Sequence, residues 1–308
     1  MIDSKPKFWD KKSLSSISLA LYPLSLIVLL FSFLSKFKKS KKYDIPIICV
    51  GNIYIGGTGK TPICLKLYDF LKNKRKNPAF VKKYYDFLSD EIEILKSKGR
   101  VYSEENRVKS IDKLIDDGHK VAIVDDGYQD YSFDKKLNIL CFNENQWIGN
   151  GMVMPSGPLR ENISSVKRAH CILINGNQDD KKEKLLLKYN SSLKFFYFTY
   201  KILNHEIISN DKIFAFAGIG NPSNFFELLR LNNLNVIGTK CFPDHYKFKS
   251  TDIENLIDIS KSENATLLTT EKDYFRLDNK FKKLIKHVKI TAIPKKEDEF
   301  FNFINSYI

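Results

Sequence analysis

The chain has 308 residues, 43% of them hydrophobic, which suits one large or two ordinary folded domains with real cores. Its formal net charge of +14 favours anionic partners such as phosphates, nucleic acid or an acidic membrane surface, although lysines spread over a solvated surface give the same total. The five cysteines are widely spaced without metal-site spacing, and four lie in or beside apolar runs, so we expect core residues in a reducing compartment.

The first predicted element is an N-terminal hydrophobic helix. Residues 13–35 contain no charge, and lysines flank them on both sides. About 20 apolar residues can cross a bilayer. A cleaved signal peptide is the alternative, but lysines rather than a small-x-small cleavage site follow the run. We expect residues 1–42 to form a membrane-associated helix with basic flanks, either spanning the membrane or lying in it.

Apolar runs and helical patterns alternate from residue 43 onward. The predicted strands are residues 45–50, 78–81, 120–126, 137–142, 170–175 and 193–203, with helical spacing over 60–74 and 103–117. This alternation is typical of a parallel sheet covered by helices, which we assign to a nucleotide-binding domain over residues 43–200. Strands at 213–220, 235–239, 265–270 and 287–293 follow, so residues 201–308 are predicted to form a second, smaller α/β domain.

The segment VGNIYIGGTGKTP, residues 50–62, has the features of a phosphate-binding loop between a strand and a helix. Glycines let the backbone approach an anion, helix N–H groups point at it, and the lysine adds a charge. The usual opening glycine is replaced by Tyr54, and a glycine-rich turn without a ligand is the alternative. The predicted ATP-binding residues are Tyr54, Ile55, Gly56, Gly57, Thr58, Gly59, Lys60 and Thr61.

Two adjacent acids are the candidates for holding Mg²⁺ at this site. Asp125 and Asp126 end the apolar run KVAIVDD, where the second strand of such ATPases presents its acid to the metal. Two acids before a glycine could instead begin a turn. We expect one of them to contact the metal directly or through water and the other to orient it, with the Thr61 hydroxyl on the same ion.

These residues resemble the tetraacyldisaccharide 4'-kinases, the lipid A 4'-kinases of Gram-negative bacteria. Residues 50–62 are similar to the family's loop, Gly-Asn-x-x-x-Gly-Gly-x-Gly-Lys-Thr-Pro, which also lacks the opening glycine. The segments DDGYQ, GNGMVMPSGPLRE, AGIGNPSNFF, FPDHY and TTEKD resemble further family motifs in the expected order. The resemblance implies an α/β fold with a P-loop kinase-like parallel sheet. It also implies transfer of the ATP γ-phosphate to the 4'-hydroxyl of tetraacyldisaccharide 1-phosphate, with ATP and Mg²⁺ as cofactors.

The resemblance extends the binding site beyond the loop. Lys60 would act on the β- and γ-phosphates, and Glu161 would join the acids around Mg²⁺. The segment VKKYYD stands where the family has Ser-Arg-Gly-Tyr, so Lys83 and Tyr85 would replace its arginine and tyrosine. The predicted substrate-binding residues are Lys83, Tyr85, Gln129 and Arg160, and a surface ion pair is the alternative for Arg160.

Asp90 and His245 are the predicted catalytic residues beside Lys60. Asp90 lies where the family has Gly-Asp-Glu-Pro, and Asp244-His245 matches its Asp-His pair. Asp90 would accept the proton of the sugar hydroxyl, and His245, from the second domain, would support it. The alternatives are an acid that opens a helix and an ordinary loop histidine.

The expected partners are the lipid substrate, an acylated glucosamine disaccharide 1-phosphate, and the membrane surface on the cytoplasmic face of the bacterial inner membrane. No obligate protein partner is evident from the sequence. Nucleic acid is not expected, because the aromatic residues lie mainly inside apolar strand patterns. The alternative function is a membrane-bound P-loop ATPase acting on a protein partner, which would hydrolyse ATP without a lipid acceptor.

Overall fold

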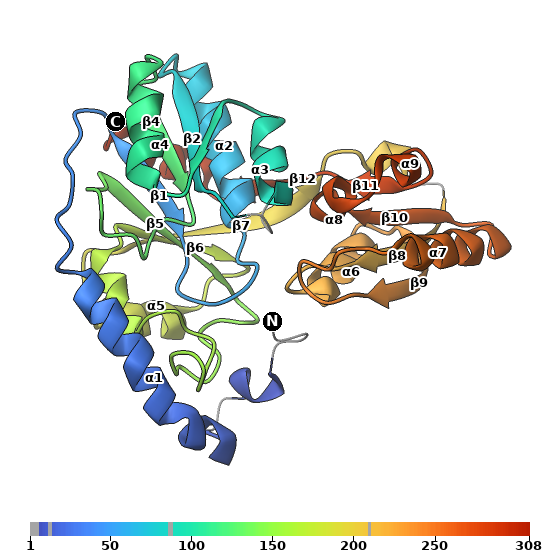
Figure 1. Ribbon diagram of the computed structural model, residues 1–308, viewed down its shortest axis with the longest axis horizontal. Coiled ribbons are helices and arrows are strands. Elements are labelled where there is room, and N and C mark those ends of the chain that lie inside the picture. The colour runs from blue at the N-terminus through green and yellow to red at the C-terminus, as the bar shows by residue number, and fades with distance from the viewer. Residues whose placement is uncertain (1–5, 12–13, 86–88, 209–210) are drawn as a thin grey trace. The chain divides into compact units, whose positions relative to one another are not determined.

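The computed structural model describes residues 6–11, 14–85, 89–208 and 211–308 and contains two compact units (Figure 1). The described part of the larger unit comprises residues 6–11, 14–84, 98–199 and 292–308, and that of the smaller unit comprises residues 85, 89–97, 200–208 and 211–291. Two segments differ from the expected division, because residues 89–97 belong to the smaller unit and residues 292–308 to the larger one.

The larger unit is built on an eight-stranded sheet. Its order is β12 (Ile290–Pro294), β7 (Lys194–Ile202), β6 (Cys171–Asn175), β5 (Leu137–Asn143), β1 (Ile47–Gly51), β4 (Val121–Asp125), β2 (Pro78–Lys83) and β3 (Val101–Glu104). The strands from β7 to β3 in this order pair in parallel. Parallel strands need helical crossovers that cover both faces, which explains why their sequences are almost continuously apolar.

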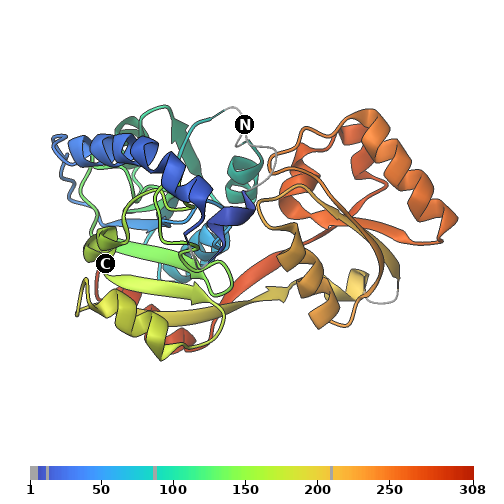
Figure 2. The same ribbon diagram turned by 90° about the horizontal axis from the view of Figure 1, so that it is seen from below.

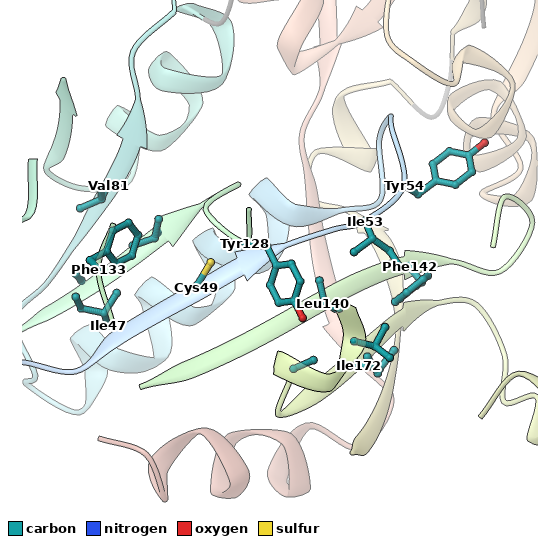
Figure 3. Packing of buried hydrophobic residues seen from close by; sticks show 14 of the residues in the cluster. Ile47, Cys49, Ile53, Tyr54, Val81, Tyr128, Phe133, Leu140, Phe142 and Ile172 are labelled. Atoms are coloured by element: carbon teal, nitrogen blue, oxygen red, sulfur yellow. The ribbon is translucent and has the colours of Figure 1, made fainter. Parts of the chain in front are cut away.

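Alternate side chains of these strands enter two different layers. Ile47 and Cys49 of β1 belong to the cluster shared with α4 (Arg107–Asp116), the 3-10 helix η3 (Ile163–Arg168) and α5 (Asp180–Leu187), part of which Figure 3 shows. On the opposite face lie α2 (Lys60–Asn73) and α10 (Glu297–Asn305), whose Phe70 and Phe301 rings stack with centroids 4.3 Å apart. Four cysteines are buried free thiols, as predicted, but Cys241 is exposed, contrary to the expectation that it is a core residue.

The N-terminal helix α1 (Ser16–Ser35), which follows the 3-10 helix η1 (Lys7–Trp9), contacts the rest of the larger unit through its serines and through Val28 and Leu29. Asn150 Nδ2 donates to Ser18 Oγ at 3.2 Å, and Ser25 Oγ lies 2.8 Å from both the Val153 carbonyl oxygen and the Ser156 hydroxyl. Seven residues are about two helical turns, so both serines share one face. Most of the large apolar side chains of α1 are exposed, and the helix is long and apolar enough to cross a membrane.

The smaller unit has a four-stranded parallel sheet in the order β11 (Lys286–Val288), β10 (Thr266–Thr270), β8 (Lys212–Ala217) and β9 (Asn235–Cys241). Ile213 and Ala215 of β8 pack with α6 (Pro222–Leu231), whereas Phe216 packs with α7 (Ser250–Ser262) and α9 (Asn279–Lys282). Figure 2 shows α6 and α7 on opposite faces of this sheet. The helices α3 (Ser89–Lys96) and α8 (Glu271–Arg276) and the 3-10 helix η4 (His205–Ile207) complete the unit.

Two predicted elements differ from the structure. The helix predicted from residue 103 begins only at Arg107, because the Asn106 side chain accepts a hydrogen bond from the Val108 N–H and caps α4, while residues 101–104 form β3. The strand predicted over residues 287–293 is two strands, β11 and β12, which belong to different sheets. An apolar run gives no signal that separates two short strands with one residue between them.

Candidate active site

The loop between β1 and α2 has the backbone geometry of an anion-binding turn. Gly56 and Gly59 have φ angles of 125° and 92°, which only glycine adopts without strain, and Gly59 is the N-cap of α2. Asn52 Nδ2 closes the loop by donating to Gly56 O at 3.2 Å and Thr58 Oγ1 at 3.0 Å. The loop therefore leads directly to the N-terminus of a 14-residue helix, whose N–H groups and dipole attract phosphate.

Tyr54, at the position of the missing opening glycine, has a structural role in the loop. Its ring is buried in the core cluster, and its hydroxyl donates to Asp10 at 2.8 Å (Figure 3). Its backbone pairs with Leu159, and Ile55 N donates to Pro158 O at 2.8 Å. The side chain of Tyr54 is thus committed to the fold, and a role in ATP binding falls to its backbone.

Asp125 is fully buried beside the start of α2, on the sheet face that α2 covers. It ends β4 directly opposite Lys82 of β2, and Lys82 Nζ lies 2.7 Å from Asp125 Oδ2 with both side chains almost completely buried. Thr61 Oγ1 donates to the same oxygen at 3.1 Å. Within the described part of the chain, the buried Asp125 Oδ1 has no hydrogen-bond partner. Lys82 and Thr61 thus hold Asp125 Oδ2 and leave Asp125 Oδ1 available.

Asp126 lies just past the end of β4 and is surrounded by cations. Arg160 Nη1 contacts both carboxylate oxygens, at 2.8 and 3.0 Å, and Lys60 Nζ lies 3.6 Å away. Arg107 Nη2 donates to the Asp126 carbonyl oxygen at 2.7 Å. Burial raises the pKa of Asp126, but the charges of Lys60, Arg160 and Lys82 outweigh it and hold the pKa well below its ordinary value. Asp126 is therefore ionised, and Arg160 belongs to this cluster.

The remaining predicted residues of this site have varied surroundings. Gln129 Nε2 donates to Asn52 O at 2.9 Å, next to the loop. Glu161 is buried, but its carboxylate accepts from Arg168 Nη2 at 2.7 Å rather than facing Thr61 or the two aspartates. Lys83 ends β2 and is partly buried, and Tyr85 is exposed.

The larger unit offers oxygen donors that suit a nucleotide-bound Mg²⁺. The described residues contain no group of three or more His, Cys, Asp or Glu side chains that could hold a metal ion alone. Mg²⁺ in kinases is normally bound by one or two protein oxygens plus phosphates and waters. The Thr61 hydroxyl and the available Asp125 Oδ1 fit that pattern beside the loop.

The structure brings Asp90 and His245 together in the smaller unit. Asp90 is fully buried in the first turn of α3, and its Oδ1 accepts from Glu91 N at 2.9 Å. Its Oδ2 lies 3.9 Å from His245 Nδ1 and 3.4 Å from Arg276 Nε. We expected the two residues to come from different domains, but α3 packs with α8 and both residues belong to one unit. Asp90 also opens a helix, so this alternative is compatible with a catalytic role.

Sequence patterns missed four charged residues around these groups: Lys82, Arg107, Arg168 and Arg276. Lys82 left a partial signal, because two consecutive lysines at the end of a buried strand must point to opposite faces of the sheet. Which lysine faces the acids depends on the strand register, which the sequence does not contain.

Comparisons with known proteins identify the family. The family model described as tetraacyldisaccharide-1-P 4'-kinase matches residues 17–92 and 88–308. A tetraacyldisaccharide 4'-kinase of Pelagibacter ubique is 39% identical over 289 residues, 92% of each chain. That of Rickettsia bellii is 35% identical over 291 residues, 88% of this chain and 89% of the relative. The chain belongs to the tetraacyldisaccharide-1-P 4'-kinase family.

A solved structure of the 4'-kinase family has the same fold. The crystal structure of the "apo" form of LpxK from Aquifex aeolicus in complex with ATP superposes with a TM-score of 0.71 and covers 94% of this chain and 99% of that chain, at 21% identity. The predicted P-loop kinase-like α/β fold is thus confirmed, as is the predicted class of ATP-dependent lipid kinase. The comparisons do not favour the alternative of an ATPase that acts on a protein partner.

Proposed function

We propose that this chain performs the 4'-kinase reaction of its family with the residues described above. That reaction transfers the γ-phosphate of ATP to the 4'-hydroxyl of tetraacyldisaccharide 1-phosphate, a step in lipid A biosynthesis. The observation that carries the residue assignment is the cluster of Lys60, Thr61, Asp125 and Asp126 at the start of α2, directly after a glycine loop. Phosphoryl transfer needs mainly positioning and charge stabilisation, which such a cluster supplies.

The loop amides and Lys60 bind the β- and γ-phosphates. Lys60 Nζ faces Asp126 at 3.6 Å, a distance that holds the ammonium near the site without a tight ion pair. A flexible lysine can then move its charge to the transferring phosphate, where negative charge builds up. Asp126, whose carboxylate is held by Arg160, keeps the ammonium of Lys60 in place before ATP arrives.

The direct protein ligands of Mg²⁺ in this proposal are Thr61 and Asp125. Both oxygens of Asp126 face Arg160, whereas Asp125 retains a buried oxygen with no partner among the described residues. When bound, Mg²⁺ would neutralise the negative charge of the phosphates. Glu161 is not a ligand of Mg²⁺ in this proposal, because its carboxylate is bound by Arg168. Its role is to hold residues 158–161 in place.

Asp90 is the general base for the acceptor. As the sugar 4'-oxygen attacks the γ-phosphorus and the bond to ADP breaks, Asp90 Oδ2 takes the hydroxyl proton, and His245 orients the carboxylate. Lys83, Tyr85 and Gln129 bind the anionic disaccharide headgroup together with Arg160. The phosphate loop belongs to the larger compact unit, and the proposed base belongs to the smaller one.

The N-terminal helix brings the enzyme to its lipid substrate. The exposed apolar side chains of α1 form a surface typical of membrane contact, and a cluster of lysines follows it: Lys36, Lys38, Lys39, Lys41 and Lys42. Each lysine near an anionic leaflet contributes about 1 kcal/mol. We place the enzyme at the cytoplasmic face of the inner membrane, where ATP and the lipid meet.

The decisive experiment incubates purified full-length protein with labelled ATP and tetraacyldisaccharide 1-phosphate. We expect a labelled lipid bisphosphate, and we expect Asp90→Ala to lose about 10²- to 10⁴-fold in turnover while ATP binding is retained. Hydrolysis of ATP without a labelled lipid would overturn the assigned activity. A fully active Asp90→Ala variant would remove only the base.

A further inference from the structure

Arg276 is anchored at the C-terminal end of α8 by a rigid buried acid. Asp273 is completely buried and accepts hydrogen bonds from Gly218 N at 3.0 Å and Thr270 Oγ1 at 2.8 Å. Arg276 Nη2 pairs with Asp273 Oδ1 and also donates to Gly218 O at 2.9 Å. A guanidinium held at several points keeps one orientation, because its donors form a planar fork.

The Nε edge of the same guanidinium faces the proposed base. Arg276 Nε lies 3.4 Å from Asp90 Oδ2, and both side chains are almost wholly buried. Gly218 O also accepts from His245 N at 3.1 Å, so Arg276 is linked to both members of the proposed pair. Neither Asp90 Oδ2 nor Arg276 Nε makes a well-aligned hydrogen bond within the described part of the structure, although they are close. Catalytic hydrogen bonds are often long in the absence of substrate and tighten with it.

We propose that Arg276 is the positioning residue for Asp90, which sets the orientation of the carboxylate that accepts the 4'-hydroxyl proton. This inference rests on the proposed role of Asp90 as base. With Oδ1 bound by the Glu91 N–H and Oδ2 facing the guanidinium, the carboxylate has one defined rotamer. A 1 Å displacement of a reacting group can cost about 10²-fold in rate.

A second ion pair between the same two helices supplies a matched control. Lys272 of α8 pairs with Glu91 of α3 and is only partly buried. Glu91 directly follows Asp90, and Lys272 lies one helical turn before Arg276. Lys272→Met therefore weakens the contact between α8 and α3 without touching Asp90. If Arg276 only held α3 in place, the two variants would behave alike.

The test compares Arg276→Met, Arg276→Lys and Lys272→Met in the full-length enzyme, with kcat and KM measured for ATP and for tetraacyldisaccharide 1-phosphate. Arg276→Met should lower kcat about 10- to 100-fold with KM for ATP unchanged. Arg276→Lys keeps the cation but not the planar fork, so it should recover only part of kcat.

His245 from the loop after β9 and Asp273 from α8 also face Asp90, and both remain in each variant. A wild-type kcat in Arg276→Met, or the same loss of kcat in Lys272→Met, would overturn the inference. If Arg276→Met does not fold, Arg276→Lys alone tests the proposal. A wild-type kcat in Arg276→Lys would show that the planar guanidinium is not needed to orient Asp90. A fully active Asp90→Ala would instead refute the base itself.

Discussion

The buried pair of Lys82 and Asp125 makes a sharp prediction for stability. At 2.7 Å, Coulomb's law gives an attraction of about 6 kcal/mol for an effective dielectric constant of about 20, and desolvation of both ions offsets much of it. Removing one partner is different, because it leaves an uncompensated charge in the interior. Breaking such a pair costs about 3–5 kcal/mol. We therefore expect Lys82→Met to lose about that much in the free energy of unfolding.

The assay is thermal and denaturant unfolding of the nucleotide-free protein. For domains of about 150–250 residues, each kcal/mol moves Tm by about 2–4 °C, so the expected drop is about 6–20 °C. Lys83→Met is the matched control: Lys83 is the next residue, is partly exposed and points to the other face of β2, so its loss should stay below about 1 kcal/mol.

A double variant separates the charge effect from lost packing. Lys82→Met with Asp125→Asn removes both charges and keeps an oxygen that can accept from the Thr61 hydroxyl. It should therefore be more stable than Lys82→Met alone, by a coupling energy of about 0.5–3 kcal/mol. A Lys82→Met variant as stable as the wild type, or a double variant no better than the single one, would refute the reasoning.

Three further predictions concern the phosphate loop, pH and the membrane. Lys60→Ala should abolish transfer with a nearly unchanged unfolding curve, because the ion pair of Lys60 Nζ with Asp126 is long, at 3.6 Å; near-normal turnover would mean that the loop is not the nucleotide site. His170 accepts a hydrogen bond from Asn138 N through Nδ1, and burial lowers the pKa of its imidazole below 6.5. The unfolded state therefore binds more protons below pH 6.5, and the free energy of unfolding should decrease as the pH is lowered. His170→Asn should flatten this slope in pH-dependent unfolding, and an unchanged slope would contradict the prediction. Leu30→Glu with Phe31→Glu, both exposed on α1, should release the protein from vesicles of acidic lipid in a sedimentation assay without changing ATP binding, and undiminished sedimentation would exclude this helix as the membrane contact.

Local patterns in the sequence were sufficient for the family, the nucleotide loop and much of the sheet. A glycine-rich turn needs particular residues at fixed spacing, and buried parallel strands need continuous apolar runs, so both leave their signal within a short stretch. Asp125 and Asp126 were recognisable as candidate acids because they stand at the end of such a strand. The different surroundings of the two acids could not be predicted, because they depend on Lys82, Arg107 and Arg160 from other segments of the chain.

Only the tertiary structure decided which charges meet. Lys82 opposes Asp125 because β2 and β4 pair in one register, and a shift of one residue would have placed Lys83 there. Asp90 joins His245 and Arg276 because α3 packs with α8, more than 180 residues later in the chain. Residue types and spacing carry the chemistry of each group, but the distance between two side chains on different elements is set by strand register and helix packing, which no local pattern records.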